Sequence, residues 1–162
     1  MAKRPGPIRV PETFEKRFPT ANKSATETVV NLLRTESLIA AGLSRRFRTY
    51  GLSLATFNVL AILDGADQAL CPAEIGSRLL VTRGTVTGLL DSLEKKSLVR
   101  RVPDAADRRM LRIEMTAKGR DLLKRLLPEH FAGEVELTAG LTDRERETLV
   151  RLLGKLQAPL EP

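Results

Sequence analysis

Small, hydroxyl and guanidinium side chains are concentrated in one short stretch of this chain. The stretch comprises Thr82, Arg83, Gly84, Thr85, Thr87 and Gly88. Val86, Leu89, Leu90 and Leu93 recur within and after it at helical spacing, so these apolar residues should face a core and leave the others exposed. Small residues let another molecule approach closely, hydroxyls bond phosphates or base edges, and an arginine can bond guanine twice. The pattern favours a helix that enters the major groove of double-stranded DNA.

Two glycines inside this predicted helix lower its stability, so their presence calls for a compensating interaction. Gly84 and Gly88 each cost about 1 kcal/mol relative to alanine in a helix interior. Close approach of DNA is one compensation, and close packing against another helix is the other. An ordinary amphipathic helix with a polar outer face explains the exposed side chains but not the glycines.

Two adjacent arginines, Arg108 and Arg109, form a second candidate site. They follow a predicted turn over residues 103–107, which separates short apolar runs typical of two strands near 98–102 and 110–115. Arginines at the tip of such a hairpin suit a narrow minor groove, where negative potential is concentrated. Asp104 or Asp107 could brace one of them through an ion pair. The alternative is a solvated turn with loosely paired charges.

Helices predicted from apolar periodicity and capping signals surround these two sites. We expect helices from Ser24 to Gly51, from Ser53 to Leu63, from Ala73 to Leu80 and from Thr82 to Lys96, then one after Thr116 that is interrupted or kinked near Pro128, and a last one over residues 142–156. Ser24 with Glu27, and Thr142 with Glu145, have the spacing of a capping box. The expected fold class is mainly α with a small β-hairpin.

Charge and composition narrow the functional class. The formal net charge of the 162 residues is +7, and residues 1–23 and 82–118 each carry a net charge of +4. Such a field attracts a polyanion, in a manner that weakens as salt rises. We expect residues 1–23, with four prolines, to be a flexible arm. No apolar run is long enough to span a bilayer and no secretory signal is present, so we expect a cytoplasmic protein with no membrane partner.

The segments LLVTRGTVTGLLDSLEKKSLVRR and PDAADRRMLRIEMTAKG resemble the MarR (multiple antibiotic resistance regulator) family of winged helix-turn-helix transcription factors. The resemblance implies one domain over residues 24–162, with the winged helix-turn-helix in 53–116 and dimerisation helices in 24–51 and 117–160. It also implies a homodimer that binds a pseudo-palindromic operator, most often as a repressor. A small aromatic or anionic inducer would release the DNA.

Two features depart from the family pattern. Ser97 stands where the family commonly has glycine, just before the first strand of the hairpin, so a left-handed backbone there would be accepted at a cost. The segment before Ser24 is also longer than in minimal members. We expect its first ten residues to be disordered.

Other candidate residues carry weaker signals. Phe47, Phe57 and His130 are candidates for an inducer site, although His130 is more typical of a structural histidine. Cys71, the only cysteine, precedes a helix N-terminus where a thiol becomes more reactive, so a thiol-sensing regulator is an alternative. A winged-helix module that binds protein is another. We expect no enzyme, cofactor or metal site, because the sequence has no phosphate loop, nucleophile–base pair or ligand cluster.

Overall fold

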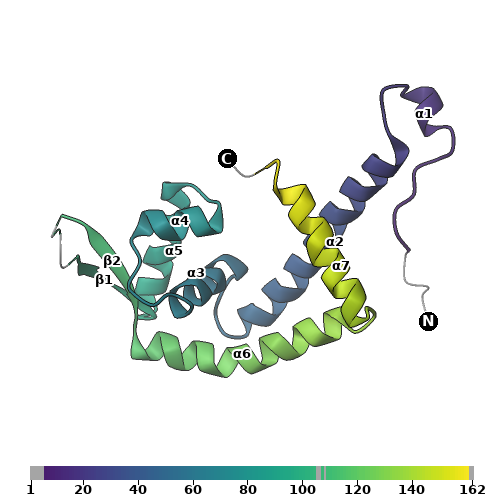
Figure 1. Ribbon diagram of the computed structural model, residues 1–162. Helices are drawn as coiled ribbons and strands as arrows, with labels where there is room; N and C mark the ends of the chain where they lie inside the picture. The colour runs from purple at the N-terminus through teal and green to yellow at the C-terminus, as the bar shows by residue number, and fades with distance from the viewer. Residues whose placement is uncertain (1–5, 105–106, 108, 161–162) are drawn as a thin grey trace. The chain divides into compact units, whose positions relative to one another are not determined.

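A computed structural model of the chain describes residues 6–104, 107 and 109–160. The chain forms two compact units, divided after Val59. Figure 1 shows the elements, whose order is α1 (Phe14–Arg17), α2 (Lys23–Arg48), α3 (Leu54–Asp64), α4 (Pro72–Leu79), α5 (Arg83–Lys95), β1 (Val99–Pro103), β2 (Leu111–Met115), α6 (Ala117–Thr138) and α7 (Asp143–Gln157). The predicted class, mainly α with one β-hairpin, is confirmed. None of the helices formed by the described residues is long and apolar enough to cross a membrane.

The helix-turn-helix consists of α4 and α5. Pro72 occupies the first turn of α4, where its missing N–H has no helical partner to lose. The hydroxyl of Thr82 caps α5 by accepting a hydrogen bond from the Thr85 N–H at 3.3 Å, as the sequence predicted. The two helices pack closely at Gly76, where an added Cβ would lie 3.0 Å from Cγ2 of Val86. A side chain at Gly76 would therefore push α4 away from α5.

The hairpin is antiparallel, with Val99 opposite Met115 and Pro103 opposite Leu111. The loop before α4 extends it, because the Ile113 N–H donates to the Leu70 carbonyl at 2.8 Å. This bridge ties the hairpin to the entrance of the helix-turn-helix. Ile113 is fully buried.

Ser97 has a φ of 58°, so the predicted left-handed backbone before the hairpin is confirmed. Its carbonyl accepts a hydrogen bond from the hydroxyl of Thr116 at 2.7 Å, and the same hydroxyl caps α6 through the Gly119 N–H at 3.0 Å. The left-handed turn thus places the start of the hairpin against the start of α6.

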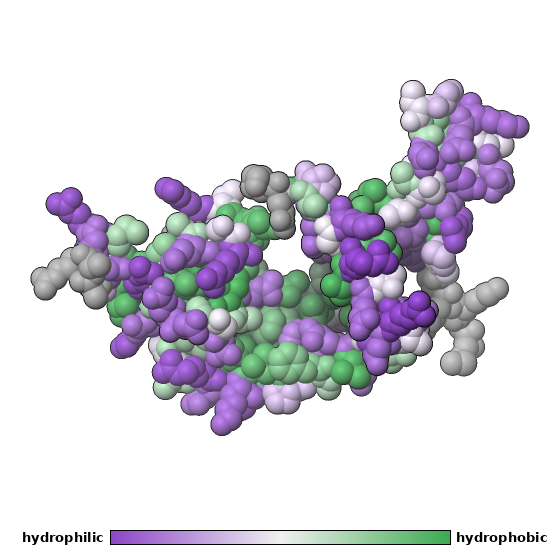
Figure 2. Space-filling model, in the orientation of Figure 1, coloured by the Kyte–Doolittle hydropathy of each residue, from purple (hydrophilic) through white to green (hydrophobic). Residues whose placement is uncertain are grey.

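Two C-terminal helices complete the second unit. The predicted interruption near Pro128 is wrong, because α6 continues through that residue to Thr138. A proline removes one backbone hydrogen bond, and the remaining turns keep the helix intact, so it bows without breaking (Figure 1). The predicted capping box of α7 is confirmed by the hydrogen bonds between Thr142 and Glu145. Figure 2 shows apolar side chains gathered along the visible face of α6.

The start of α2 differs from the prediction. The helix begins at Lys23, and Asn22 caps it by accepting a hydrogen bond from the Ala25 N–H at 2.9 Å. The capping box predicted for Ser24 and Glu27 is therefore wrong. Ser24 donates its hydroxyl proton to the Asn22 side chain instead. At the other end, Gly51 takes a positive φ of 69° and stops the chain from continuing as helix, as expected.

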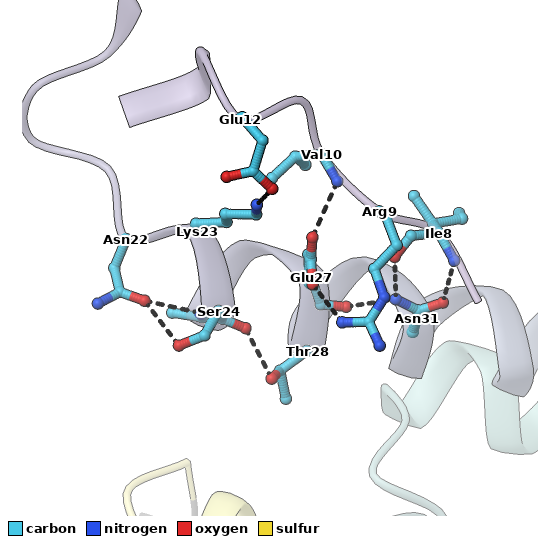
Figure 3. Close-up of polar contacts among 11 residues, drawn as sticks. Ile8, Arg9, Val10, Glu12, Asn22, Lys23, Ser24, Glu27, Thr28 and Asn31 are labelled. Carbon is cyan, nitrogen blue, oxygen red and sulfur yellow. Dashed lines mark hydrogen bonds and ion pairs between the residues drawn. The ribbon is translucent and has the colours of Figure 1, made fainter. Parts of the chain in front are cut away.

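Glu27 holds the segment that precedes α2. Its carboxylate accepts hydrogen bonds from Arg9 at 2.7 Å and from the Val10 N–H at 3.0 Å, and these bonds lower the pKa of Glu27 (Figure 3). The Asn31 amide pairs with both backbone groups of Ile8, at 2.7 and 2.9 Å. The sequence predicted a flexible arm here, whereas residues 8–10 are hydrogen-bonded to α2 and α1 follows them. The first five residues of the predicted arm lie outside the described part of the chain.

Candidate nucleic-acid interface

The six residues singled out in and before α5 are all exposed. They are Thr82, Arg83, Gly84, Thr85, Thr87 and Gly88. On the opposite face Val86, Leu90 and Leu93 are at most 1% exposed, as predicted, whereas Leu89, also predicted to face the core, is only half-buried. We call the exposed set the hydroxyl face. Its threonine hydroxyls are held in place, with Oγ1 of Thr82 and Thr85 3.0 Å apart.

The two glycines of α5 face open space. A Cβ added at Gly84 or Gly88 would meet nothing within 4 Å among the described residues. Close packing against another helix of this unit therefore does not account for them. Close approach by an external molecule is the compensation that fits, because both glycines lie on the hydroxyl face.

Replacing Gly88 with alanine should raise stability and weaken DNA binding. Alanine favours the helix by about 1 kcal/mol, and its methyl group meets no neighbour in the free protein. The same methyl would separate α5 from a groove floor, so we expect a several-fold loss of affinity by fluorescence anisotropy and a higher midpoint in thermal melts. Gly154→Ala in α7, also in open space, should raise the midpoint without changing affinity. Unchanged affinity of the Gly88 variant would contradict the role of this glycine.

The predicted arginine pair at the hairpin tip is only partly described. Arg108 lies outside the described residues. Arg109 is exposed, and its backbone N–H donates to Oδ1 of Asp107 at 2.9 Å. Asp107 thus braces the backbone of Arg109 rather than its guanidinium. The Asp107 N–H in turn donates to Asp104 at 3.2 Å.

Arg112 connects this tip to α4. Its guanidinium forms an ion pair with Asp104 and also donates to the Ala69 carbonyl at 3.0 Å and to Glu74 at 3.3 Å. Hydrogen bonds from Cys71 and the charge of Arg112 lower the pKa of Glu74, which keeps this partner anionic. One side chain therefore fixes the outer part of the hairpin, which forms the wing, to the entrance of the helix-turn-helix. Sequence reasoning did not assign this residue a role, because its partners are distant in the chain.

Arg101 forms a second connection, between the wing and α5. It forms ion pairs with Asp91, at 2.6 Å, and with Glu94. Asp91 lies on the exposed side of α5, and its pairing with Arg101 leaves it exposed. Because both connections join the wing to the helices, the hairpin and α5 present one surface.

Arg83 and Arg109 line the same groove, although they come from α5 and from the wing. The groove has a volume of about 440 Å³ and is also lined by Thr87, Cys71 and Leu111. Among the described residues, neither guanidinium forms an ion pair or a hydrogen bond. The folded chain therefore brings the two predicted sites together. Two cations in one groove that no described residue neutralises attract phosphate.

Of the weaker candidates, Cys71 lines this groove, whereas Phe47, Phe57 and His130 do not. The rings of Phe47 and Phe57 stack with centroids 4.1 Å apart and are 0% and 5% exposed, so they are core side chains in this conformation. His130 is 8% exposed, and its Nε2 lies 3.2 Å from a carboxylate oxygen of Glu134. Cys71 precedes α4, and its N–H donates to Glu74 at 2.6 Å. Contact of Phe47, Phe57 and His130 with an inducer stays a prediction, and so does a thiol-sensing role for Cys71.

Comparison with known proteins gives one consistent result. A sequence profile described as MarR family matches residues 50–110. The regulator PecS of Dickeya dadantii is 34% identical over 131 residues, which cover 80% of this chain and 79% of PecS. The transcriptional repressor YetL of Bacillus subtilis is 37% identical over 68% of this chain and 66% of its own length. The structure of S. aureus MepR bound to DNA aligns with a TM-score of 0.74 at 25% identity, covering 82% of this chain and 96% of MepR.

Proposed function

This chain belongs to the MarR family of DNA-binding transcriptional regulators, and we propose that it represses transcription by binding a pseudo-palindromic operator as a homodimer. Regulators of this family are not enzymes. The single observation that supports the assignment of the site is the groove in which Arg83 of α5 and Arg109 of the wing lie, neither of them ion-paired with any described residue.

Each part of the interface has a distinct task in this proposal. The hydroxyl face enters the major groove, where Arg83 bonds a guanine through two hydrogen bonds. Thr82, at the helix N-terminus, bonds a phosphate, which the helix dipole also favours. Arg109, with Arg108 beside it in the sequence, enters the adjacent minor groove. The connections through Arg101 and Arg112 hold wing and helix in one arrangement, so less ordering is needed on binding.

Exposed apolar side chains support the homodimer. They lie on α2 (Val29, Leu32, Leu33, Leu38), on α6 (Phe131, Val135, Leu137) and on α7 (Leu149, Val150, Leu152, Leu156), and each is more than 40% exposed. Apolar surface of this extent is typical of an interface. A twofold dimer would present two copies of α5 to half-sites about one helical turn apart, which explains a pseudo-palindromic operator.

The direction of control and its release are further parts of the proposal. YetL of Bacillus subtilis, which is 37% identical over 111 residues, is a transcriptional repressor, which favours repression here. We propose that a small aromatic or anionic inducer releases the DNA by favouring a dimer geometry that no longer matches the half-site spacing. A thermal-shift screen of small aromatic acids, followed by DNA release, tests this. An acid that stabilises the protein but leaves DNA binding unchanged is not an inducer.

A mobility-shift assay with the DNA upstream of the chain's own gene tests the central proposal. We expect a complex that prefers that sequence over random duplex and weakens steeply with salt. Footprinting should show two protected half-sites, and sedimentation of the free protein should show a dimer. A monomer at micromolar concentration would contradict the homodimer, and binding without sequence preference would contradict the operator.

The two alternatives from the sequence make different predictions. A winged-helix module that binds protein would bind its partner equally well after Arg83→Ala and Arg109→Ala. A thiol-sensing regulator is favoured by the position of Cys71 in the same groove as the two arginines. It would lose DNA affinity on treatment with peroxide, and Cys71→Ser would abolish that response while leaving the affinity of the reduced protein unchanged.

A further inference from the structure

Two residues other than glycine have a positive φ in the described part of the chain, Leu80 and Ser97. The backbone of Ser97 joins the hairpin to α6 through the hydrogen bond with Thr116. Leu80 has φ 55° and ψ 42°, in the left-handed region that glycine and asparagine adopt more readily than leucine. A leucine here is strained, so its side chain requires a separate explanation.

The fold explains the backbone of Leu80 but not its side chain. The α4 helix must stop at this point, because Gly76 packs against Val86 and the Val81 N–H bonds the Gly76 carbonyl at 3.1 Å. Any residue that accepts a left-handed backbone could end α4 at this position. The leucine side chain contributes nothing to the core, since Leu80 is 88% exposed.

The position of Leu80 indicates what it contacts. It lies two residues before Thr82, the cap of α5, in the turn that leads into the hydroxyl face, and Val81 beside it is 38% exposed. In the proposed function α5 enters a major groove, so the turn that precedes it lies at the edge of that groove. The apolar groups that DNA offers there are the 5-methyl group of thymine and the carbons of deoxyribose.

We propose that Leu80 is a DNA-contacting residue, whose side chain packs against these apolar groups of the operator. The inference rests on the proposed function and adds a residue to the interface outside α5 and the wing. Strain in the free protein is then balanced by a contact that forms only in the complex. Stability and affinity should therefore respond in opposite directions when the leucine is replaced.

Leu80→Gly and Leu80→Asn test this, with Ser97→Gly as the matched control. All three substitutions place a residue that tolerates positive φ at a left-handed position, so each should raise the midpoint of thermal unfolding. We expect the two Leu80 variants to bind the operator at least five-fold more weakly, whereas Ser97→Gly should stay within two-fold of the unmodified protein. Asparagine controls for the extra flexibility of glycine, and Leu80→Met, which restores an apolar side chain, should recover most of the affinity.

Operators with deoxyuridine in place of thymine distinguish the two apolar groups. If the methyl group is the partner, one such operator should weaken binding of the unmodified protein and not of Leu80→Gly. If deoxyribose is the partner, Leu80→Gly weakens binding to every operator equally. Equal affinity of Leu80→Asn and the unmodified protein overturns the inference and leaves the proposed function standing. An unmodified protein that binds no operator overturns both.

Discussion

Replacing Gly119 with alanine is expected to destabilise the protein more than the same change at Gly76, Gly84 or Gly88. The added Cβ would lie 2.2 Å from the Leu98 carbonyl oxygen and 2.8 Å from Cγ of Met115. The oxygen cannot yield easily, because it accepts hydrogen bonds from the Thr116 N–H at 3.0 Å and from the Thr116 hydroxyl at 3.2 Å. Overpacking against fixed backbone should lower the free energy of unfolding by about 3 kcal/mol or more.

Urea denaturation followed by circular dichroism measures this effect. The comparison variant is Gly88→Ala, which adds the same methyl group to a helix where nothing lies within 4 Å and should raise the midpoint. The Gly119 variant should also lose DNA binding, because the junction that it disrupts supports the base of the wing. If both variants melt like the unmodified protein, the close contact between α6 and the start of the hairpin is not a feature of the folded chain.

Arg83→Ala should cause the largest loss of DNA affinity among the described residues. A bidentate contact between arginine and guanine contributes about 1–3 kcal/mol of discrimination, which corresponds to roughly 5- to 150-fold in affinity. The side chain is exposed and forms no ion pair among the described residues, so its removal leaves no buried charge behind. The loss should be concentrated on the correct operator, because a base contact contributes little to binding of random duplex.

Anisotropy titrations with the operator and with random duplex, at several salt concentrations, measure both components. The matched control is Arg100→Ala, which removes the same charge from an exposed arginine of β1 paired with Glu114 at 2.6 Å. We expect less than a two-fold effect from the control. If the two variants weaken operator and random duplex alike and to the same extent, Arg83 acts only through its charge.

Much of the local structure could be predicted from residues close together in the chain. The caps of α5, α6 and α7 are threonines that bond a backbone N–H three residues later, so a short window of sequence contains both partners. The apolar period of α5 separates its buried and exposed faces for the same reason. The prediction failed at α2, where Asn22 and Ser24 are both good caps. Asn22 is the cap in the structure, and the Glu27 carboxylate, which a capping box with Ser24 would require, binds the preceding segment instead.

By itself, the sequence determined most of α2 to α7, the hairpin and the two basic sites, because each depends on residues within about one helical turn or one β-turn. It did not predict α1, and the left-handed turn at Ser97 was expected only from the family resemblance. Only the tertiary structure decided how the sites are joined. It placed Arg83 and Arg109 in one groove, paired Asp91 with Arg101, and fixed the wing to α4 through Arg112. These contacts join residues far apart in the chain, so they depend on how helices pack and which strand residues face each other. A single sequence leaves that packing open, because many acidic and basic residues could pair equally well until the core excludes all but one arrangement.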